Sequence, residues 1–273
     1  MSQTAVSQTA VSQTAGPQTA GARIAVAGGT GNVGRHVVAA LRGAGHEAVV
    51  LSRASGMDLM TGHGLDDALA DATAVVDVLN TPAVDPDGVR AFFGTTTRNL
   101  LAAEERAGVR HHVLLSIVGV DRVQGNVHYE GKRLQEELVT AAPVPGTIVR
   151  ATQFHDFAAM VVGWTRREGA ATVAPLLVQP VAPSDVGDAL ARIALGSPAG
   201  TVELAGPGPQ DLVDMARRTL AARGDAIRLI PTWRGLFGPE MAGEVLLPGP
   251  DAMLAPTTFE QWLATEGRAT HPG

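Results

Sequence analysis

Apolar residues along this chain follow two alternating patterns: short continuous runs, and longer stretches in which they recur three and four positions apart. A short continuous run is typical of a buried strand, whereas the second spacing indicates a helix with one buried face. Strands that alternate with helices form βαβ units, so this order predicts an α/β fold with a doubly wound parallel sheet covered on both faces. The predicted strands span residues 23–28, 46–53, 74–80, 111–119 and 146–152, and the predicted helices span 34–45, 64–72, 89–108 and 132–142.

The pattern changes beyond residue 152. Residues 228–249 are rich in glycine, proline and tryptophan, as in a loop that closes over a pocket. One of the later helices is expected to be capped by Ser184 or Asp185, which are good capping residues, and to end at Gly196. The later helices are predicted over residues 154–169, 180–198 and 211–224, with a strand and a turn between 200 and 210.

The first part of the chain has a different composition. From Ser2 to Gly21 a five-residue unit is written four times, as SQTAV, SQTAV, SQTAG and PQTAG, with no charged or aromatic residue. Such a segment has too little apolar surface to offset the entropy of ordering, so residues 1–21 are expected to form a disordered tail. The folded part is expected to begin near Ala22, and residues 267–273 are expected to be a frayed tail.

Composition and charge exclude several classes of function. The 273 residues carry a formal net charge of -6 at pH 7, which argues against nucleic acid or an anionic membrane surface as partner. The chain has no cysteine, which excludes thiolate sites and suits a reducing compartment, so we expect a cytoplasmic protein. No apolar run reaches the roughly 18–20 residues that span a bilayer, and we expect no membrane partner and no secretion signal.

The histidines are not spaced as metal ligands are, so no metal site is predicted. His111 and His112 stand at a predicted turn before a strand, where a position at the surface is expected. The sequence DPDG at residues 85–88 is better explained as a turn than as a calcium loop.

Three glycines, Gly28, Gly31 and Gly34, stand between the first predicted strand and the first predicted helix. Glycine allows a tight turn and a close approach of the backbone to a bound pyrophosphate, while the following helix offers free N–H groups and the positive end of its dipole. The spacing Gly-x-x-Gly-x-x-Gly differs from the Gly-x-Gly-x-x-Gly of the older dehydrogenases. Its place after a strand, before a helix and at the start of an alternating α/β region is nevertheless the context that predicts dinucleotide binding.

The end of the second predicted strand indicates which dinucleotide. A carboxylate there would accept hydrogen bonds from both ribose hydroxyls and repel a 2′-phosphate. Ser52 and Arg53 occupy that place, and no carboxylate follows until Asp58. A guanidinium can bind a phosphate through two hydrogen bonds, and Arg35, just past the glycines, could add a second positive charge. The sequence therefore favours NADPH over NADH.

Six motifs in order resemble one family: GGTGNVGRHVV, LSR, GMDLMTG, VVDVLNTP, SIVGVD and RATQFH. Together they resemble the atypical short-chain dehydrogenases/reductases of the NmrA-like or NAD(P)H-binding type, from Arg23 to Leu263. The resemblance implies a Rossmann domain with a small C-terminal substrate-binding portion. We therefore expect an NADP-binding core over residues 22–152 and, over residues 153–266, a C-terminal part that completes the sheet and forms the substrate cleft.

The resemblance also implies roles for individual residues. Asp58 and Leu59 would flank the adenine, and residues 152–155 would lie beside the nicotinamide. Phe154, His155 and Trp233 are the candidates for substrate contact, with simple packing as the alternative for Trp233. Cofactor contacts are expected from Gly28, Thr30, Gly31, Asn32, Val33, Gly34, Ser52, Arg53, Asp58, Leu59, Leu79, Asn80, Thr81 and Lys132.

In short-chain reductases a serine, a tyrosine and a lysine act together, with the tyrosine four residues before the lysine on one helix. Residues four apart share a helix face, so the ammonium lowers the pKa of the phenol, which exchanges the proton that accompanies hydride transfer. By resemblance, Ser116 matches the serine, which would hydrogen-bond the substrate oxygen, and Lys132 matches the lysine. The tyrosine does not match, because the sequence HYEGK puts His128 four residues before Lys132 and Tyr129 three before it.

Three alternatives are therefore open for the proton donor. Tyr129 can still face Lys132, because residues three apart are also neighbours on a helix. His128 can serve instead, since its ordinary pKa lies near neutrality. In the third alternative neither residue acts.

The sequence favours an NADPH-dependent oxidoreductase that reduces a small carbonyl, enone or imine compound. One alternative is an NAD(P)-binding redox sensor that regulates a partner without turnover, and another is a cofactor-dependent isomerase or epimerase. The imperfect spacing of tyrosine and lysine keeps the sensor alternative open.

Overall fold

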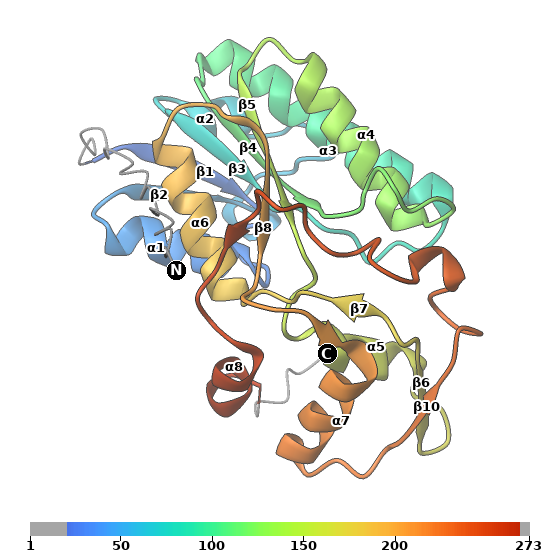
Figure 1. The fold of residues 1–273 in the computed structure, drawn as a ribbon. Helices are drawn as coiled ribbons and strands as arrows, with labels where there is room; N and C mark the ends of the chain where they lie inside the picture. The colour runs from blue at the N-terminus through green and yellow to red at the C-terminus, as the bar shows by residue number, and fades with distance from the viewer. Residues whose placement is uncertain (1–20, 268–273) are drawn as a thin grey trace, which may run out of the picture.

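The computed structural model describes residues 21–267, so the predicted tails, residues 1–21 and 267–273, lie outside the described residues apart from Gly21 and Gly267. The centre is a seven-stranded sheet in the order β11-β8-β5-β4-β3-β1-β2, in which every pair of neighbours is parallel (Figure 1). The predicted α/β fold with a doubly wound parallel sheet is confirmed. The strands of this sheet are β1 (Arg23–Ala27), β2 (Glu47–Leu51), β3 (Ala74–Asp77), β4 (His112–Ile117), β5 (Gly146–Ala151), β8 (Gly200–Ala205) and β11 (Met253–Leu254).

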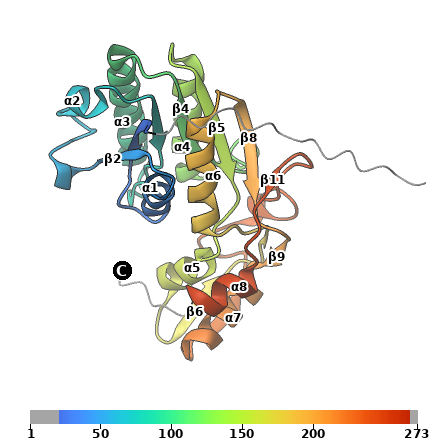
Figure 2. The same ribbon diagram turned by 90° about the vertical axis from the view of Figure 1, so that its left-hand side faces the viewer.

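Helices cover both faces of the sheet, as the two ribbon views show (Figures 1 and 2). On one face α1 (Gly34–Gly43) packs against α6 (Pro183–Leu195). The two helices approach closely at Gly187, where an added Cβ would lie 2.4 Å from the Cβ of His36. Because the central strands are buried between two helical layers, β1 and β3 are apolar except for Arg23 at the start of one and Asp77 at the end of the other. The helices on the other face are α2 (Leu65–Leu69), α3 (Pro86–Ala107) and α4 (Val127–Ala141).

Residues beyond 152 extend the sheet and also build a second, smaller layer of structure. Strands β8 and β11 complete the sheet beside β5. The other C-terminal elements are α5 (Phe157–Thr165), β6 (Ala170–Val173), β7 (Leu177–Val178), β9 (Gln210–Asp211), α7 (Leu212–Arg223), β10 (Arg228–Pro231) and α8 (Phe259–Thr265). Strand β6 pairs with β10 in parallel, and β7 pairs with β9 in antiparallel fashion. These elements surround an apolar cluster of their own, the C-terminal cluster, which includes Val161, Leu212 and Trp262.

Helix α4 begins at Val127, earlier than the predicted start at Lys132. The side-chain oxygen of Asn126 accepts hydrogen bonds from the backbone N–H groups of His128 and Tyr129, at 3.1 and 3.2 Å. These bonds satisfy donors that a helix start otherwise leaves free, so Asn126 caps the helix. His128 and Tyr129 consequently stand on its first turn.

The predicted caps of α6 are wrong at its start and confirmed at its end. Ala182 occupies the N-cap position, and no side chain caps the helix there. The carboxylate of Asp185 instead accepts hydrogen bonds from the backbone N–H and the hydroxyl of Thr257, at 3.0 and 2.9 Å. Asp185 therefore binds Thr257, which is distant in the sequence, and not the backbone at the start of its own helix. Gly196 ends the helix as predicted.

His111 and His112 are both buried, so the prediction that they lie at the surface is wrong. Nδ1 of His112 lies 2.8 Å from the carboxylate of Glu104 on α3, and Nε2 of His111 lies 2.8 Å from the hydroxyl of Thr147. Burial alone lowers the pKa of His112, but the neighbouring Glu104 carboxylate raises it above its ordinary value. Both imidazoles can be buried because each has a polar partner on another element, Glu104 on α3 and Thr147 on β5.

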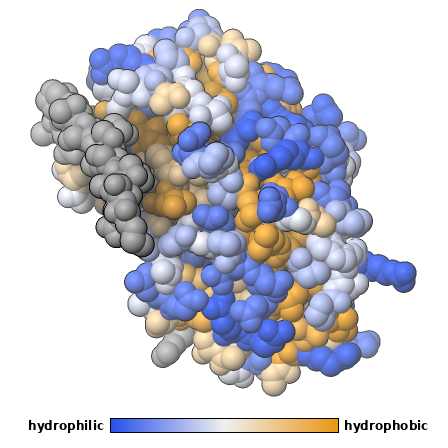
Figure 3. All heavy atoms as spheres, viewed as in Figure 1, coloured by the Kyte–Doolittle hydropathy of each residue, from blue (hydrophilic) through white to orange (hydrophobic). Residues whose placement is uncertain are grey.

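The surface seen in Figure 3 is mainly polar, with several apolar patches. Trp164 on α5 and Leu236 in the loop after β10 are among the exposed large apolar residues, each about half exposed. No helix within residues 21–267 is long and apolar enough to cross a membrane. Within the same residues, no group of three or more histidine, cysteine, aspartate or glutamate side chains is placed to hold a metal ion.

Candidate cofactor and active site

A cavity of about 1120 Å³ lies at the carboxyl ends of the central strands. Its walls are formed by the loops after β1, β2 and β3, by the end of β4, and by side chains of α3 and α4. Strand β1 lies between β2 and β3, so the order of strands reverses beside it. In open α/β sheets this reversal leaves a crevice at the carboxyl ends of the strands, and ligands bind there.

The glycine loop, residues 28–34, joins β1 to α1. Gly28 has a φ of +81°, which side chains disfavour, and a Cβ added to Gly34 would lie 2.1 Å from the carbonyl oxygen of Gly28. Gly34 therefore allows α1 to start against the loop. No side chain of the described residues caps α1, which leaves the positive end of its dipole for an anion. This loop fits the pyrophosphate of a dinucleotide.

The structure brings the predicted cofactor residues together at one cavity. The exception is Gly34, which packs behind the loop. Arg53 is exposed and begins a short 3-10 helix, η1 (Arg53–Ser55). Arg35 does not line the cavity and donates a hydrogen bond to Asn32 at 3.3 Å. The predicted cofactor residues that line the cavity are Gly28, Thr30, Gly31, Asn32, Val33, Ser52, Arg53, Asp58, Leu59, Leu79, Asn80, Thr81 and Lys132.

Asp77 at the end of β3 is fully buried behind the cavity wall. Its carboxylate accepts hydrogen bonds from the backbone N–H of Leu79, at 2.9 Å, and from Nε2 of Gln135 on α4, at 3.2 Å. These bonds hold the loop 79–81 in place. Sequence reasoning missed Asp77, although a carboxylate inside the apolar run AVVDVL was a visible signal.

Lys132 of α4 lines the cavity and is 5% exposed. Its Nζ donates hydrogen bonds to the backbone carbonyls of Leu79, at 3.2 Å, and Leu115, at 3.0 Å, and lies 4.9 Å from the centre of the Phe93 ring. Burial lowers the pKa of Lys132 to about 8, against the opposing effect of the Asp77 charge. The ammonium therefore ties the ends of β3 and β4 together and places a buried charge beside the cavity.

His128 and Tyr129 point in different directions from the first turn of α4. His128 lines the cavity together with Lys132 and contacts Phe93 edge-on, with ring centres 5.7 Å apart. Burial and the charge of Lys132 lower the pKa of His128 to about 4, so its imidazole is neutral at pH 7. Tyr129 belongs to the C-terminal cluster, where Gln153 donates a long hydrogen bond to its hydroxyl at 3.4 Å and burial raises its pKa to about 12. The cavity is thus lined by His128 and not by Tyr129.

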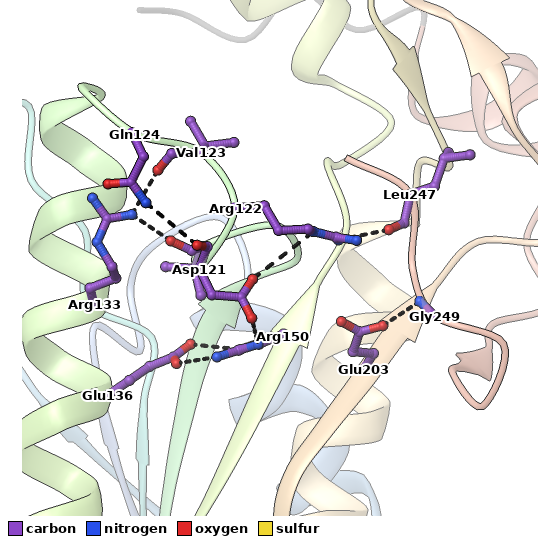
Figure 4. A network of polar contacts seen from close by, with 11 residues as sticks. Asp121, Arg122, Val123, Gln124, Arg133, Glu136, Arg150, Glu203, Leu247 and Gly249 are labelled. Carbon is purple, nitrogen blue, oxygen red and sulfur yellow. Dashed lines mark hydrogen bonds and ion pairs between the residues drawn. The ribbon is translucent and has the colours of Figure 1, made fainter. Parts of the chain in front are cut away.

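Ser116 at the end of β4 lines the cavity and donates a hydrogen bond to Oε1 of Glu136 on α4, at 2.5 Å. The guanidinium of Arg150 on β5 binds both oxygens of Glu136, at 3.1 and 2.8 Å. Arg150 also binds the exposed carboxylate of Asp121, at 3.0 Å. Figure 4 shows this row of charges, in which Arg150 lies between Glu136 and Asp121. It connects the cavity wall to the surface.

The residues expected to contact substrate are divided by the structure. Phe154 lines the cavity. His155 does not; it is buried, with Nε2 3.0 Å from the carbonyl oxygen of Thr257 and its ring against Phe259. Trp233 is partly buried and packs against the C-terminal cluster, away from the cavity lining. Phe154 is thus the member of this group that the structure places at the site.

Helix α3 contributes cavity-lining residues that sequence reasoning missed, among them Ala91, Phe92 and Thr96. Phe92 and Thr96 are four residues apart, so they share a helix face. That spacing was visible in the sequence, but the facing element was not, because α3 meets the cavity only once it packs beside α4.

Solved structures with similar folds bind nicotinamide cofactors. The UDP-glucose 4-epimerase of Thermus thermophilus, solved with NAD, is 20% identical, with 77% of this chain and 86% of that chain covered and a TM-score of 0.63. The NADPH-dependent quinone oxidoreductase of Escherichia coli, solved with NADPH, is 19% identical over 77% and 78% of the two chains, with a TM-score of 0.62. The Citrobacter triphenylmethane reductase, solved with NADP(H), is 19% identical over 77% and 79%, with a TM-score of 0.60.

At these identities the likeness establishes the fold alone. None of the curated protein sequences compared with the chain is significantly similar to it. A family model described as NAD(P)H-binding matches residues 28–194, which include the glycine loop, Arg53, His128 and Lys132. The match covers more than half of the chain and includes all the residues that line the cavity. The chain therefore belongs to the NAD(P)H-binding family.

Proposed function

We propose that this protein is an NADPH-dependent oxidoreductase that reduces a small carbonyl, enone or imine compound. The observation that carries the proposal is the composition of one cavity, which combines the glycine loop and Arg53 with His128, Lys132 and Phe154. An anion-binding loop and a cationic group suit a phosphorylated dinucleotide. An apolar ring and a pair of titratable side chains suit the reacting part of a small substrate.

The chain supplies a separate group for each part of the cofactor. The glycine loop would hold the pyrophosphate, and Arg53 would bind the 2′-phosphate that distinguishes NADPH from NADH. Asp58 and Leu59 would border the adenine, and the loop 79–81, fixed by Asp77, would border the rest of the cofactor. NADPH, when bound, supplies the hydride.

The chain must then stabilise the negative charge that develops on the substrate oxygen or nitrogen. His128 is neutral at pH 7, and the N–H of a neutral imidazole can donate a hydrogen bond to such an atom, while water supplies the proton that completes the reduction. The buried ammonium of Lys132 acts on the same charge through its field, which is little screened inside the protein. We assign the role of hydrogen-bond donor to His128, and to Tyr129 no contact with substrate.

A redox sensor without turnover is the second candidate. The observation that favours it is the position of Tyr129, the single tyrosine of the chain, whose hydroxyl lies in the C-terminal cluster. In that case the cavity would bind NADP(H) and report its occupancy to a partner.

Two measurements on the purified protein test the proposal. Calorimetry with NADPH and NADH measures cofactor binding. The near-ultraviolet absorbance of NADPH then reports its oxidation in the presence of quinones, enones, imines and ketones. We expect NADPH to bind and to be oxidised with members of at least one of these classes. Binding without oxidation would favour the sensor, interconversion of sugar nucleotides without net oxidation would favour an epimerase, and no binding of either nucleotide would refute the cofactor assignment.

A further inference from the structure

The hydroxyl proton of Ser116 is directed at Glu136, which does not line the cavity. Ser116 is 2% exposed, and its Oγ lies 2.5 Å from Oε1 of Glu136. A serine hydroxyl has one proton and two lone pairs, so a proton given to Glu136 leaves only acceptor capacity for the cavity. A distance of 2.5 Å is typical of a hydrogen bond from a hydroxyl to an ionised carboxylate.

The carboxylate of Glu136 accepts hydrogen bonds from a guanidinium as well as from Ser116. The fork of Arg150 donates to both of its oxygens, and hydrogen bonds to Glu136 raise the pKa of Arg150 further above its ordinary value. A guanidinium does not lose its proton in proteins, so it cannot accept one from Glu136 or from Ser116. The carboxylate is therefore an acceptor towards both neighbours, and the only proton available to the Ser116–Glu136 contact is that of the serine.

We propose that Ser116 acts towards the cavity as a hydrogen-bond acceptor. Glu136 is the positioning residue, because it takes the hydroxyl proton of Ser116. The group that Ser116 recognises is then an O–H or N–H donor and not a carbonyl oxygen. The proposal deepens the proposed function and rests on it for the identity of the ligand. By resemblance, the serine was expected to hydrogen-bond the substrate oxygen; the proposal instead makes Ser116 the acceptor of a hydrogen bond.

Other side chains of the cavity can bind the reacting carbonyl or imine in place of Ser116. His128 and Lys132 carry donors at the cavity wall, so a reacting carbonyl or imine has partners other than Ser116. A hydrogen-bond donor on the ligand then meets Ser116. Two sources have this chemistry: the carboxamide N–H₂ of the cofactor, and a hydroxyl or amino group of the substrate.

Proton NMR of the full-length protein tests the polarity directly. A proton in a short hydrogen bond to a carboxylate resonates far downfield and exchanges slowly with water. We expect one such signal, absent in Ser116→Ala and retained when NADPH saturates the protein. Its absence, or its loss on addition of NADPH, would overturn the proposal. If NADPH does not bind, the proposed function fails, while the signal of the free protein still decides the polarity of Ser116.

Glu136→Gln separates a positioning role from a structural one. Replacing the carboxylate by a neutral amide should move the Ser116 signal upfield or abolish it, and an unchanged signal would overturn the proposal. Should Glu136→Gln fail to fold, Ser116→Cys provides a second measurement, because the chain has no other cysteine. Beside the carboxylate of Glu136 the introduced thiol should titrate above its ordinary pKa of about 8.5, because a neighbouring negative charge and burial both disfavour the thiolate. Thiolate absorbance follows this titration, and a pKa below the ordinary value would overturn the proposal.

A cofactor analogue identifies the source of the donor. In 3-acetylpyridine adenine dinucleotide phosphate a methyl group replaces the carboxamide N–H₂. If the cofactor supplies the donor, NADP⁺ should bind at least tenfold more tightly than the analogue, and Ser116→Ala should remove the difference. If the substrate supplies it, the two dinucleotides should bind equally and Ser116→Ala should raise the KM of the substrate. The proposal would be overturned if the analogue bound more tightly than NADP⁺ and Ser116→Ala removed that difference.

Discussion

His128 and Lys132 lie one turn apart on α4, and both side chains line the same cavity. Residues four apart share a helix face, and the charge of Lys132 contributes to the low pKa of His128. Short-chain reductases, which this chain resembles, carry a tyrosine at the position of His128. Here an imidazole stands in its place, and Tyr129 faces the C-terminal cluster.

If His128 donates the hydrogen bond to the reacting atom of the substrate, His128→Phe should lower turnover by about 10²–10³-fold. This is the usual effect of removing one hydrogen-bond donor to a developing negative charge. NADPH affinity should change little, because His128 acts on substrate. Tyr129→Phe is the matched control: it removes one hydroxyl from the adjacent residue, and turnover should stay within a few-fold. Steady-state rates with a confirmed substrate check both variants. A large loss in Tyr129→Phe with none in His128→Phe would reverse the assignment.

The buried charge of Lys132 should make stability depend on pH in the alkaline range. The folded pKa, about 8, lies below the ordinary value of 10.5, so the unfolded chain binds this proton more tightly. Below pH 8 both states are protonated and the buried charge lowers the free energy of unfolding. Between pH 8 and 10.5 the folded protein loses the proton first, so stability rises with pH.

The pH dependence of the unmodified protein is compared with that of Lys132→Met, a variant that lacks the ammonium of Lys132 and keeps all other titratable groups. Urea unfolding at several values from pH 7 to pH 10 measures the free energies of unfolding. We expect the difference between the unmodified protein and the variant to shift in favour of the unmodified protein as pH rises through 8. Parallel pH curves would show that Lys132 titrates in the folded protein as it does in the unfolded chain.

Arg53 should determine the preference for NADPH. We expect NADPH to bind at least tenfold more tightly than NADH, a difference of about 1.4 kcal/mol, and Arg53→Asp to abolish or invert that preference. Arg192→Asp, on the exposed side of α6, makes the same change of charge away from the cavity and should leave the preference intact. Calorimetric titration with both nucleotides provides the comparison, and equal affinities in the unmodified protein would contradict the role of Arg53.

Gly34→Ala should disrupt the glycine loop. The added Cβ would meet the carbonyl oxygen of Gly28 at 2.1 Å and the Cα of Gly29 at 2.7 Å, so the backbone must move. We expect a loss of stability of about 1–3 kcal/mol and a loss of NADPH affinity of at least tenfold.

Gly43→Ala is the control for Gly34→Ala at the other end of α1. A Cβ at Gly43 would meet nothing within 4 Å, so stability should be unchanged or raised by up to about 1 kcal/mol. Thermal unfolding and NADPH titration distinguish the two variants. Equal behaviour of both would show that the close contact at Gly34 is not what shapes the loop.

The sequence by itself determined the fold class and much of the lining of the candidate cofactor cavity. In β1 every residue after Arg23 is apolar and buried because both faces of a parallel sheet are covered, and this pattern is local. The glycine loop and Arg53 were also predictable, because they follow directly on strands whose carboxyl ends must meet at one edge of the sheet. These features depend on neighbours in the chain, which a sequence displays.

Only the tertiary structure decided which side chain lines the cavity together with Lys132. The sequence allowed both His128 and Tyr129, since three and four residues apart are both neighbours on a helix. The choice followed from the start of α4 at the Asn126 cap and from the C-terminal cluster, which buries Tyr129 on the other side. Likewise the links between Ser116, Glu136 and Arg150 join three separate elements. Such contacts depend on how distant segments pack, and the periodicity of a sequence carries no record of that packing.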